Sequence, residues 1–249
     1  MSSPRLYLLD VEGTTSPISL VYEQLFPYAR KHLEPYLRAH VREPEIDAGL
    51  EADLALLAEE NAAEDESAGA PRFNAPEDGA SWEGAVPQAA AYLLWLMDRD
   101  RKSTALKALQ GCVWRAGFEA GELVGTVFDD VPAALAGWSR EARVAIYSSG
   151  SVEAQQLLFR YSSAGDLTPY ISAYFDTRVG LKSSAESYRA IAAAMGVAAE
   201  EIVFLSDVVR ELDPAREAGC LTRLSVREGN APVVDLHGHA AIESFMAVM

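Results

Sequence analysis

The chain contains four short, largely apolar segments, and each is bounded by polar residues or glycine. Runs of this kind are typical of strands that are buried inside a sheet. The four segments are Leu6–Leu9, Val144–Tyr147, Ile202–Leu205 and Leu221–Val226. Their spacing predicts a sheet whose strands are far apart in the sequence.

Helical patterns fill the intervals between the later strands. They extend over Val152–Tyr161, Ser184–Met195 and Asp213–Ala218. Ser151 is the expected N-cap of the first helix, and Gly196 is the expected stop of the second. Strand and helix alternate from about Val131 onward, which predicts an α/β fold with a parallel sheet covered by helices on both faces.

The region between the first strand and this alternating part has helical periodicity only. The expected helices are Val21–Val41, Ile46–Glu60, Gln88–Asp98 and Thr104–Ala120. We therefore expect residues 1–19 and 125–249 to form the α/β core, and residues 20–124 to form an inserted helical domain. Within the insertion, residues from about 60 to 86 are rich in Ala, Gly, Glu, Asp and Pro, which predicts an acidic surface loop.

Composition narrows the possible functions. The 249 residues include 21 Lys and Arg against 37 Asp and Glu, a formal net charge of −16, which disfavours binding to nucleic acid or an anionic membrane. The two cysteines, Cys112 and Cys220, lack the spacing of a zinc site, and we expect both to be reduced. Because Met1–Arg5 lacks the features of a signal peptide and no apolar run could span a membrane, we expect a cytoplasmic protein without membrane partners.

Three of the predicted strands end in polar side chains, namely Asp10, Ser148 and Asp207. Ligands of an open parallel sheet bind at the carboxyl ends of its strands, so we expect these three residues to lie at one edge. An aspartate can attack phosphorus and form an acyl-phosphate, which divides a hydrolysis into two steps. Asp10 is our candidate nucleophile. Asp10 and Asp207 are also suitable ligands for Mg²⁺, which would offset the repulsion between two anions.

Other residues near these strand ends suit supporting roles. Glu12 fits a general acid for the leaving oxygen and then a base for the hydrolytic water. Ser148 and Ser149 fit a phosphate cradle at a helix N-terminus, although a plain loop into a helix is also consistent with them. Lys182 fits a phosphate contact, although a lone lysine is usually a surface charge. Glu211 could support the metal site or simply complement a helix dipole.

In combination, the Asp-x-Glu-Gly-Thr-Thr segment, the Ser-Ser-Gly turn, Lys182 and the Ser-Asp-x-x-x-Glu segment resemble the four ordered motifs of the haloacid dehalogenase superfamily. Longer segments are similar to the enolase-phosphatases of methionine salvage, the acireductone synthases. They are residues 10–19, 25–29, 100–111, 146–155 and 175–182. The superfamily's commoner phosphatases carry Asp at the position of Glu12, whereas enolase-phosphatases carry Glu.

This resemblance implies a Rossmann-like core with a helical cap inserted after the first strand. It implies that the substrate, 2,3-diketo-5-methylthiopentyl-1-phosphate, is enolised and then dephosphorylated to the acireductone 1,2-dihydroxy-3-keto-5-methylthiopentene. It further implies one Mg²⁺ per subunit held by Asp10, Asp207 and the backbone carbonyl of Glu12, with phosphate bound by Ser148, Ser149 and Lys182. A monomer is expected.

Several points stay open from the sequence. Glu12 is the candidate base for enolisation, and the helical insertion is expected to act as a lid. Tyr22, Phe26 and Trp114 could contact substrate there, but their helical spacing favours core packing. Residues 231–249, which include His237 and His239, are expected to form a surface turn and a closing helix. The alternative functions are a Mg²⁺-dependent phosphatase of another small ester without an enolase step, and a regulatory module that has lost turnover.

Overall fold

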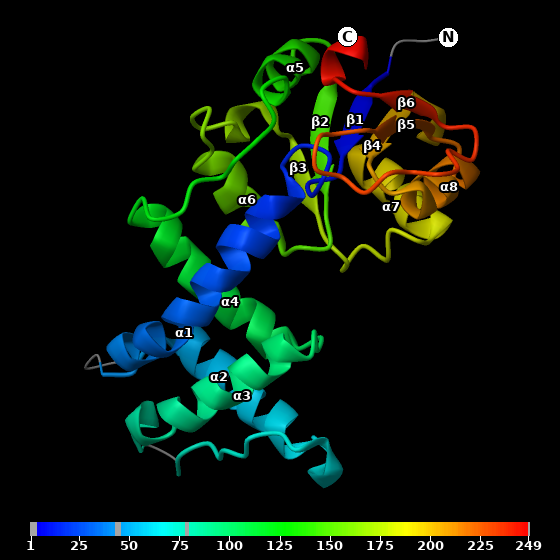
Figure 1. Ribbon diagram of the computed structural model, residues 1–249. Helices are drawn as coiled ribbons and strands as arrows, with labels where there is room; N and C mark the ends of the chain where they lie inside the picture. The colour runs from blue at the N-terminus through cyan, green and yellow to red at the C-terminus, as the bar shows by residue number, and fades with distance from the viewer. Residues whose placement is uncertain (1–3, 43–45, 78–79, 249) are drawn as a thin grey trace. The chain divides into compact units, whose positions relative to one another are not determined.

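The computed structural model describes residues 4–42, 46–77 and 80–248, and its contacts divide the chain into two compact units (Figure 1). The first unit comprises Met1–Gln24 and Gly121–Met249, and it contains a parallel six-stranded sheet in the order β3-β2-β1-β4-β5-β6. The strands are β1 (Leu6–Leu9), β2 (Arg143–Tyr147), β3 (Ala173–Phe175), β4 (Ile202–Ser206), β5 (Leu221–Ser225) and β6 (Ala240–Ile242). The four strands expected from the apolar runs are all present, and the predicted α/β fold is confirmed.

The central strand β1 explains why both faces of the sheet must be covered. Its four residues are all buried, and successive side chains point to opposite faces. Leu6 and Leu8 pack into a core with residues of helices α7 (Ala185–Met195) and α8 (Val209–Glu217). On the other face, the ring of Tyr7 stacks on Trp138 of helix α5 (Val131–Trp138) with 4.3 Å between ring centres.

The helix ends differ from the expectation at one place. Helix α6 (Val152–Arg160) begins after Ser151, whose hydroxyl accepts the N–H of Ala154, and α7 ends at Gly196, as predicted. Helix α8, however, begins four residues earlier than predicted and contains Pro214. Proline is most favourable in the first turn of a helix, where the N–H that it lacks would have no partner within the helix. The earlier start puts Glu211 in the first turn of α8.

Two strands, β3 and β6, were not predicted. Each has three residues, which is too short to give a periodic signal. Strand β6 corrects the expectation for residues 231–249, which do not form a turn and a closing helix alone. The tail adds the sixth strand, and the closing helix is a short 3₁₀ helix at Phe245–Val248. The buried side chain of His239 anchors this tail, because its Nδ1 lies 2.7 Å from Thr222 Oγ1 and its Nε2 3.1 Å from Asp213 Oδ1.

The second unit comprises Leu25–Ala120 and is helical. Its helices are α1 (Phe26–His40), α2 (Ala48–Ala62), α3 (Val86–Asp98) and α4 (Thr104–Glu119), and a π-helix at Leu20–Leu25 precedes them. They pack around a core of their own, which includes Leu33, Leu54, Leu93 and Leu109. These helices agree with the four predicted segments to within a few residues.

The predicted acidic loop is anchored more firmly than its composition suggests. Phe73 and Trp82 are buried in the core of the helical unit. The side-chain amide of Asn61 donates to Pro71 O at 2.7 Å and accepts the N–H of Phe73 at 3.2 Å. Most of its described residues are exposed or half-buried, so the segment lies at the surface as predicted, and Phe73, Trp82 and the contacts of Asn61 attach it to the helical unit.

The expected core packing of three aromatic residues is partly wrong. Tyr22 is 66% exposed and Phe26 is 36% exposed. Trp114 is half-buried, and its indole N–H donates to Leu25 O at 2.8 Å. Neither Cys112 nor Cys220 is in a disulfide, as expected. In the part of the chain that the structure describes, no helix is both long enough and apolar enough to cross a bilayer.

Trp138 offers a test of how the sheet face is covered. It lies between Tyr7 and Phe245, is 4% exposed, and its indole N–H has no hydrogen-bond partner among the described residues. Trp138→Ala should lower the free energy of unfolding by about 3–5 kcal/mol. Trp138→Phe, the matched control, keeps an aromatic ring against Tyr7 and loses no hydrogen bond, so it should cost clearly less. Denaturant unfolding measures both, and equal losses would show that the stacked ring is not what stabilises this face.

Candidate active site

The register of the sheet brings three strand ends together. Leu9 pairs with Ile146 of β2 on one side and with Leu205 of β4 on the other. Asp10 therefore follows β1 directly between the ends of these two neighbours, and its N–H donates to Leu205 O at 3.0 Å. The predicted convergence of Asp10, Ser148 and Asp207 at one edge follows from this register.

The loop after Asp10 is tightly folded. The N–H groups of Thr14, Thr15 and Ser16 all approach the carbonyl oxygen of Val11, at 3.2, 3.0 and 2.9 Å. Gly13 has a φ of +69°, and a methyl group at this position would overlap with the carboxylate of Asp207. Glycine is therefore required here twice, for its backbone conformation and for the close approach of Asp207.

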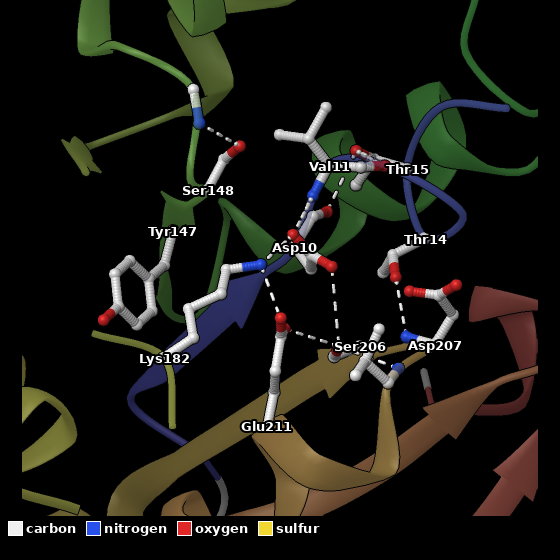
Figure 2. Close-up of polar contacts among 12 residues, drawn as sticks. Asp10, Val11, Thr14, Thr15, Tyr147, Ser148, Lys182, Ser206, Asp207 and Glu211 are labelled. Atoms are coloured by element: carbon white, nitrogen blue, oxygen red, sulfur yellow. Dashed lines mark hydrogen bonds and ion pairs between the residues drawn. The ribbon is translucent and has the colours of Figure 1, made fainter. Parts of the chain in front are cut away.

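Lys182 contacts the Asp10 carboxylate directly. Its Nζ donates to Asp10 Oδ1 and, at 3.0 Å, to Glu211 Oε2 (Figure 2). Asp10 and Lys182 are both buried, with 4% and 8% exposure. Burial alone would lower the pKa of Lys182, but the two carboxylates outweigh it and raise this pKa, so the ammonium form is held. Lys182 is thus not a surface charge.

A buried tyrosine, Tyr188, contacts the backbone of this lysine. The Tyr188 hydroxyl on α7 lies 2.8 Å from Lys182 O and 2.9 Å from Glu211 O. Tyr147, at the end of β2, donates to Gly180 O at 2.9 Å in the same loop. The segment that carries Lys182 is therefore held at two backbone carbonyls, and its ammonium group needs little reorganisation to meet an anion.

Ser206 and Glu211 complete the contacts on the other side of Asp10. Ser206 Oγ lies 3.4 Å from Asp10 Oδ2 and 3.1 Å from Glu211 Oε2 (Figure 2). Burial and then the charge of Asp10 raise the pKa of Glu211, against the lowering effect of Lys182. Glu211 is therefore placed to orient Lys182.

Asp207 lies on the side of Asp10 opposite Lys182 (Figure 2). Its N–H donates to Thr14 Oγ1 at 3.0 Å, so the two loops are joined side by side. Burial and the neighbouring charges of Asp10 and Glu211 raise the pKa of Asp207 to about 7. A carboxylate in such surroundings gains strongly from a nearby cation.

Glu12, Ser148 and Ser149 differ in their exposure to solvent. Glu12 is exposed, yet the partial loss of water around its carboxyl, together with the charge of Asp10, raises its pKa. Ser148 is buried, and its hydroxyl accepts the N–H of Gly150 at 3.0 Å, while Ser149 is exposed. Both serines lie within four residues of the start of helix α6, whose N-terminus is positive.

The donor atoms fit Mg²⁺. The negative charges of Asp10 and Glu211 contribute to the raised pKa of both Glu12 and Asp207, and the Lys182 ammonium contacts Asp10 and Glu211. The described residues contain no group of three or more His, Cys, Asp or Glu side chains arranged to enclose a metal. Carboxylate oxygens such as those of Asp10 and Asp207 are ligands that suit Mg²⁺, which is usually bound in proteins through one or two carboxylates.

Some contributors were not predicted from the sequence. Thr14, Ser206 and Tyr188 hold the predicted residues in place, and none of them was identified beforehand. Thr14 and Ser206 lie inside the quoted motifs, so their proximity to Asp10 and Asp207 was the available signal. Tyr188 gave no signal, because a tyrosine on the inner face of a helix is ordinary core.

Comparison with known proteins agrees with this geometry. The haloacid dehalogenase-like hydrolase family matches residues 4–219. The chain is 48% identical over 240 residues to enolase-phosphatase E1 of Synechococcus elongatus, covering 96% of this chain and 94% of that protein. It is 46% identical over 233 residues to enolase-phosphatase E1 of Pectobacterium carotovorum, covering 93% and 92%.

A solved structure shares the fold over nearly the whole chain. The crystal structure of the UTR4 protein of Saccharomyces cerevisiae has a TM-score of 0.74 and 34% identity, and the match covers 97% of this chain and 98% of that one. The similarity first indicated by the Asp10, Ser148, Lys182 and Asp207 motifs is therefore confirmed. The chain belongs to the enolase-phosphatase E1 family of the haloacid dehalogenase-like hydrolases.

Proposed function

We propose that this protein is a Mg²⁺-dependent enolase-phosphatase of methionine salvage. It converts 2,3-diketo-5-methylthiopentyl-1-phosphate to the acireductone and phosphate. Membership of the enolase-phosphatase E1 family supports the reaction. The observation that carries the proposal is the buried Asp10 carboxylate, held by Lys182 at the sheet edge where Asp207 and Ser148 also lie.

Asp10 performs the phosphoryl transfer. One of its carboxylate oxygens attacks phosphorus, a new oxygen–phosphorus bond forms, and the bond from phosphorus to the substrate's ester oxygen breaks. Glu12 gives its proton to that leaving oxygen. A water molecule then attacks the phosphorus of the acyl-phosphate and passes a proton to Glu12, which releases phosphate and restores Asp10.

The surroundings of Glu12 suit this exchange of roles. Its raised pKa makes the protonated form more abundant near neutral pH than for an ordinary glutamate. The side chain is exposed and so is accessible to substrate and water. Glu12 is also our candidate for the base that removes the proton next to the carbonyl during enolisation.

The phosphate group is bound by Ser148, Ser149 and Lys182. Lys182 supplies a fixed positive charge, and the serines lie at the positive end of helix α6. One Mg²⁺ per subunit, held by Asp10, Asp207 and the Glu12 carbonyl, would neutralise charge between phosphate and carboxylates when bound. The helical unit is our candidate cap domain. We further propose a monomer working in the cytoplasm, where free thiols such as Cys112 and Cys220 persist.

The function is tested by following enediol absorbance and phosphate release separately with the diketone phosphate. The parent protein should produce both signals. Asp10→Asn removes the nucleophile and should lower phosphate release by roughly 10³-fold or more. The matched control Asp235→Asn changes an exposed aspartate and should leave both signals intact. Phosphate release from many simple esters without an enediol signal would instead favour the phosphatase that lacks an enolase step.

Glu12→Gln tests the proton donor. The amide keeps the size of the side chain but cannot transfer a proton, so kcat for phosphate release should fall by roughly 10²–10⁴-fold. The fall should be smaller with an ester whose leaving group needs no protonation, such as an activated aryl phosphate. Equal losses with both kinds of ester would contradict the role of Glu12 as a general acid.

The raised pKa of Asp207 predicts how pH affects the stability of the metal-free protein. Its pKa is raised to about 7, so the folded state holds this proton more tightly than the unfolded state does. The resulting stabilisation is present at low pH and is lost as pH rises through about 7. With EDTA present, the contribution of Asp207 should therefore lower the Tm between about pH 4 and pH 7 and change it little above pH 7, and Mg²⁺ should raise the Tm more at pH 8 than at pH 5. Asp207→Asn should reduce both effects, and an unchanged pH dependence in this variant would contradict the assignment.

A further inference from the structure

Residues 227–230 form a tight turn just after strand β5, at the edge of the sheet that holds Asp10 and Asp207. The N–H of Asn230 donates to Arg227 O at 3.2 Å, and Gly229 has a φ of +89°. A positive φ at the third position of a four-residue turn favours glycine, as in a type II turn. Arg227 and Asn230 both contact the loop that follows Asp10.

Asn230 joins Gly13 to the surroundings of Asp207. Its Nδ2 donates to Gly13 O at 2.8 Å, and this contact sets the orientation of the amide, since the opposite orientation would place two oxygen atoms against each other. A methyl group at Gly13 would lie 3.0 Å from Asn230 Oδ1 and would overlap with the Asp207 carboxylate, so the amide oxygen and this carboxylate share one small region. Asn230 Oδ1 is buried and accepts no hydrogen bond from any residue that the structure describes.

Arg227 holds the next carbonyl along the same loop. Its Nε donates to Thr14 O at 3.2 Å, and its Nη1 donates to Asp130 Oδ2 at 2.9 Å. The guanidinium carbon lies 4.6 Å from the ring centre of Phe128 and 4.5 Å from that of Phe245. Arg227 is 9% exposed, so two aromatic rings and a carboxylate leave its side chain little freedom.

Asn230 and Arg227 of this turn therefore donate hydrogen bonds to two consecutive backbone carbonyls, those of Gly13 and Thr14. The Thr14 hydroxyl in turn accepts the N–H of Asp207. Glu12 immediately precedes Gly13 and Thr14 in the sequence. The position of the Glu12 carbonyl relative to the Asp207 carboxylate thus depends on contacts made by residues more than 200 positions further along the chain.

We propose that Arg227 and Asn230 are positioning residues, which hold the Glu12–Thr14 loop against Asp207 and so shape the Mg²⁺ site. This inference rests on the proposed function, because it concerns the same site. Mg²⁺ keeps several waters when bound to proteins, and Asn230 Oδ1 offers one of them an acceptor that none of the described residues fills. Residues that support metal ligands in this way typically change metal affinity by about 10–100-fold when they are replaced.

The test is Mg²⁺ titration by isothermal calorimetry on the full-length parent protein, Asn230→Ala, Arg227→Lys and Asn61→Ala. Asn61 is the matched control: its amide also donates to a backbone carbonyl, that of Pro71, but it lies in the helical unit. Asn230→Ala should raise the Kd for Mg²⁺ by about 10-fold or more. Arg227→Lys, which keeps the charge beside Asp130 but loses the fork that also reaches Thr14, should raise it too. Asn61→Ala should leave the Kd within about twofold of the parent while lowering the Tm.

The outcomes separate this inference from the proposed function. Circular dichroism identifies variants that have not folded, and either of the two positioning variants suffices for the comparison. Parent-like Mg²⁺ affinity in a folded Asn230→Ala or Arg227→Lys protein would overturn the positioning role, while the parent's enolase-phosphatase activity would stand. Equal weakening in Asn61→Ala would also overturn it, because the effect would then follow from general loss of stability. A parent that binds no Mg²⁺ would overturn both.

Discussion

The site depends on several carboxylates that lie close to one buried ammonium group, that of Lys182. Asp10 is held on one side by Lys182 and on the other by Ser206, and Glu211 contacts both of these partners. Removing such groups from water is costly unless each charge has a partner. Burial first, and then the charge of Asp10, raise the pKa of Asp207, Glu12 and Glu211, and the lowering effect of Lys182 does not offset them. Uncompensated negative charge of this kind favours a bound cation, which supports the proposed Mg²⁺.

The rest of the core serves to keep these groups in one place. Strand β1 is central in the sheet, so its end has neighbours on both sides, and the register delivers Ser148 and Asp207 beside Asp10. Buried hydroxyl and amide groups then fix the loops through their backbone carbonyls, with Tyr188 behind Lys182 and Asn230 behind Gly13. Backbone contacts of this kind limit how far the reactive side chains can move before substrate binds.

The fold was predictable where a segment was long or regular enough to give a pattern. The four apolar runs identified the four longer strands, and helical periodicity identified the described α-helices of both units except α5, which was not among the expected helices. Strands β3 and β6 were missed because three residues carry no period. The start of α8 was misplaced because Pro214 is ordinarily a first-turn residue, yet it lies within the helix here.

Deviations in packing had a different origin. Phe73 and Trp82 attach a segment whose composition is that of a loop, and Tyr22 and Phe26 are exposed despite their helical spacing. Whether an apolar side chain is buried depends on what covers it, and that information is not local. The same is true of His239, which joins the tail to Thr222 and Asp213.

The sequence by itself determined the family, the sheet's principal strands and the candidate reactive groups, because strand-end motifs such as Asp10–Thr15 are contiguous and chemically specific. The tertiary structure decided which groups touch. Lys182 meets Asp10 across 172 positions, and Asn230 meets Gly13 across 217. Contacts over such separations are set by strand order and register, so they and the pKa shifts that they cause follow only from the folded arrangement of the chain.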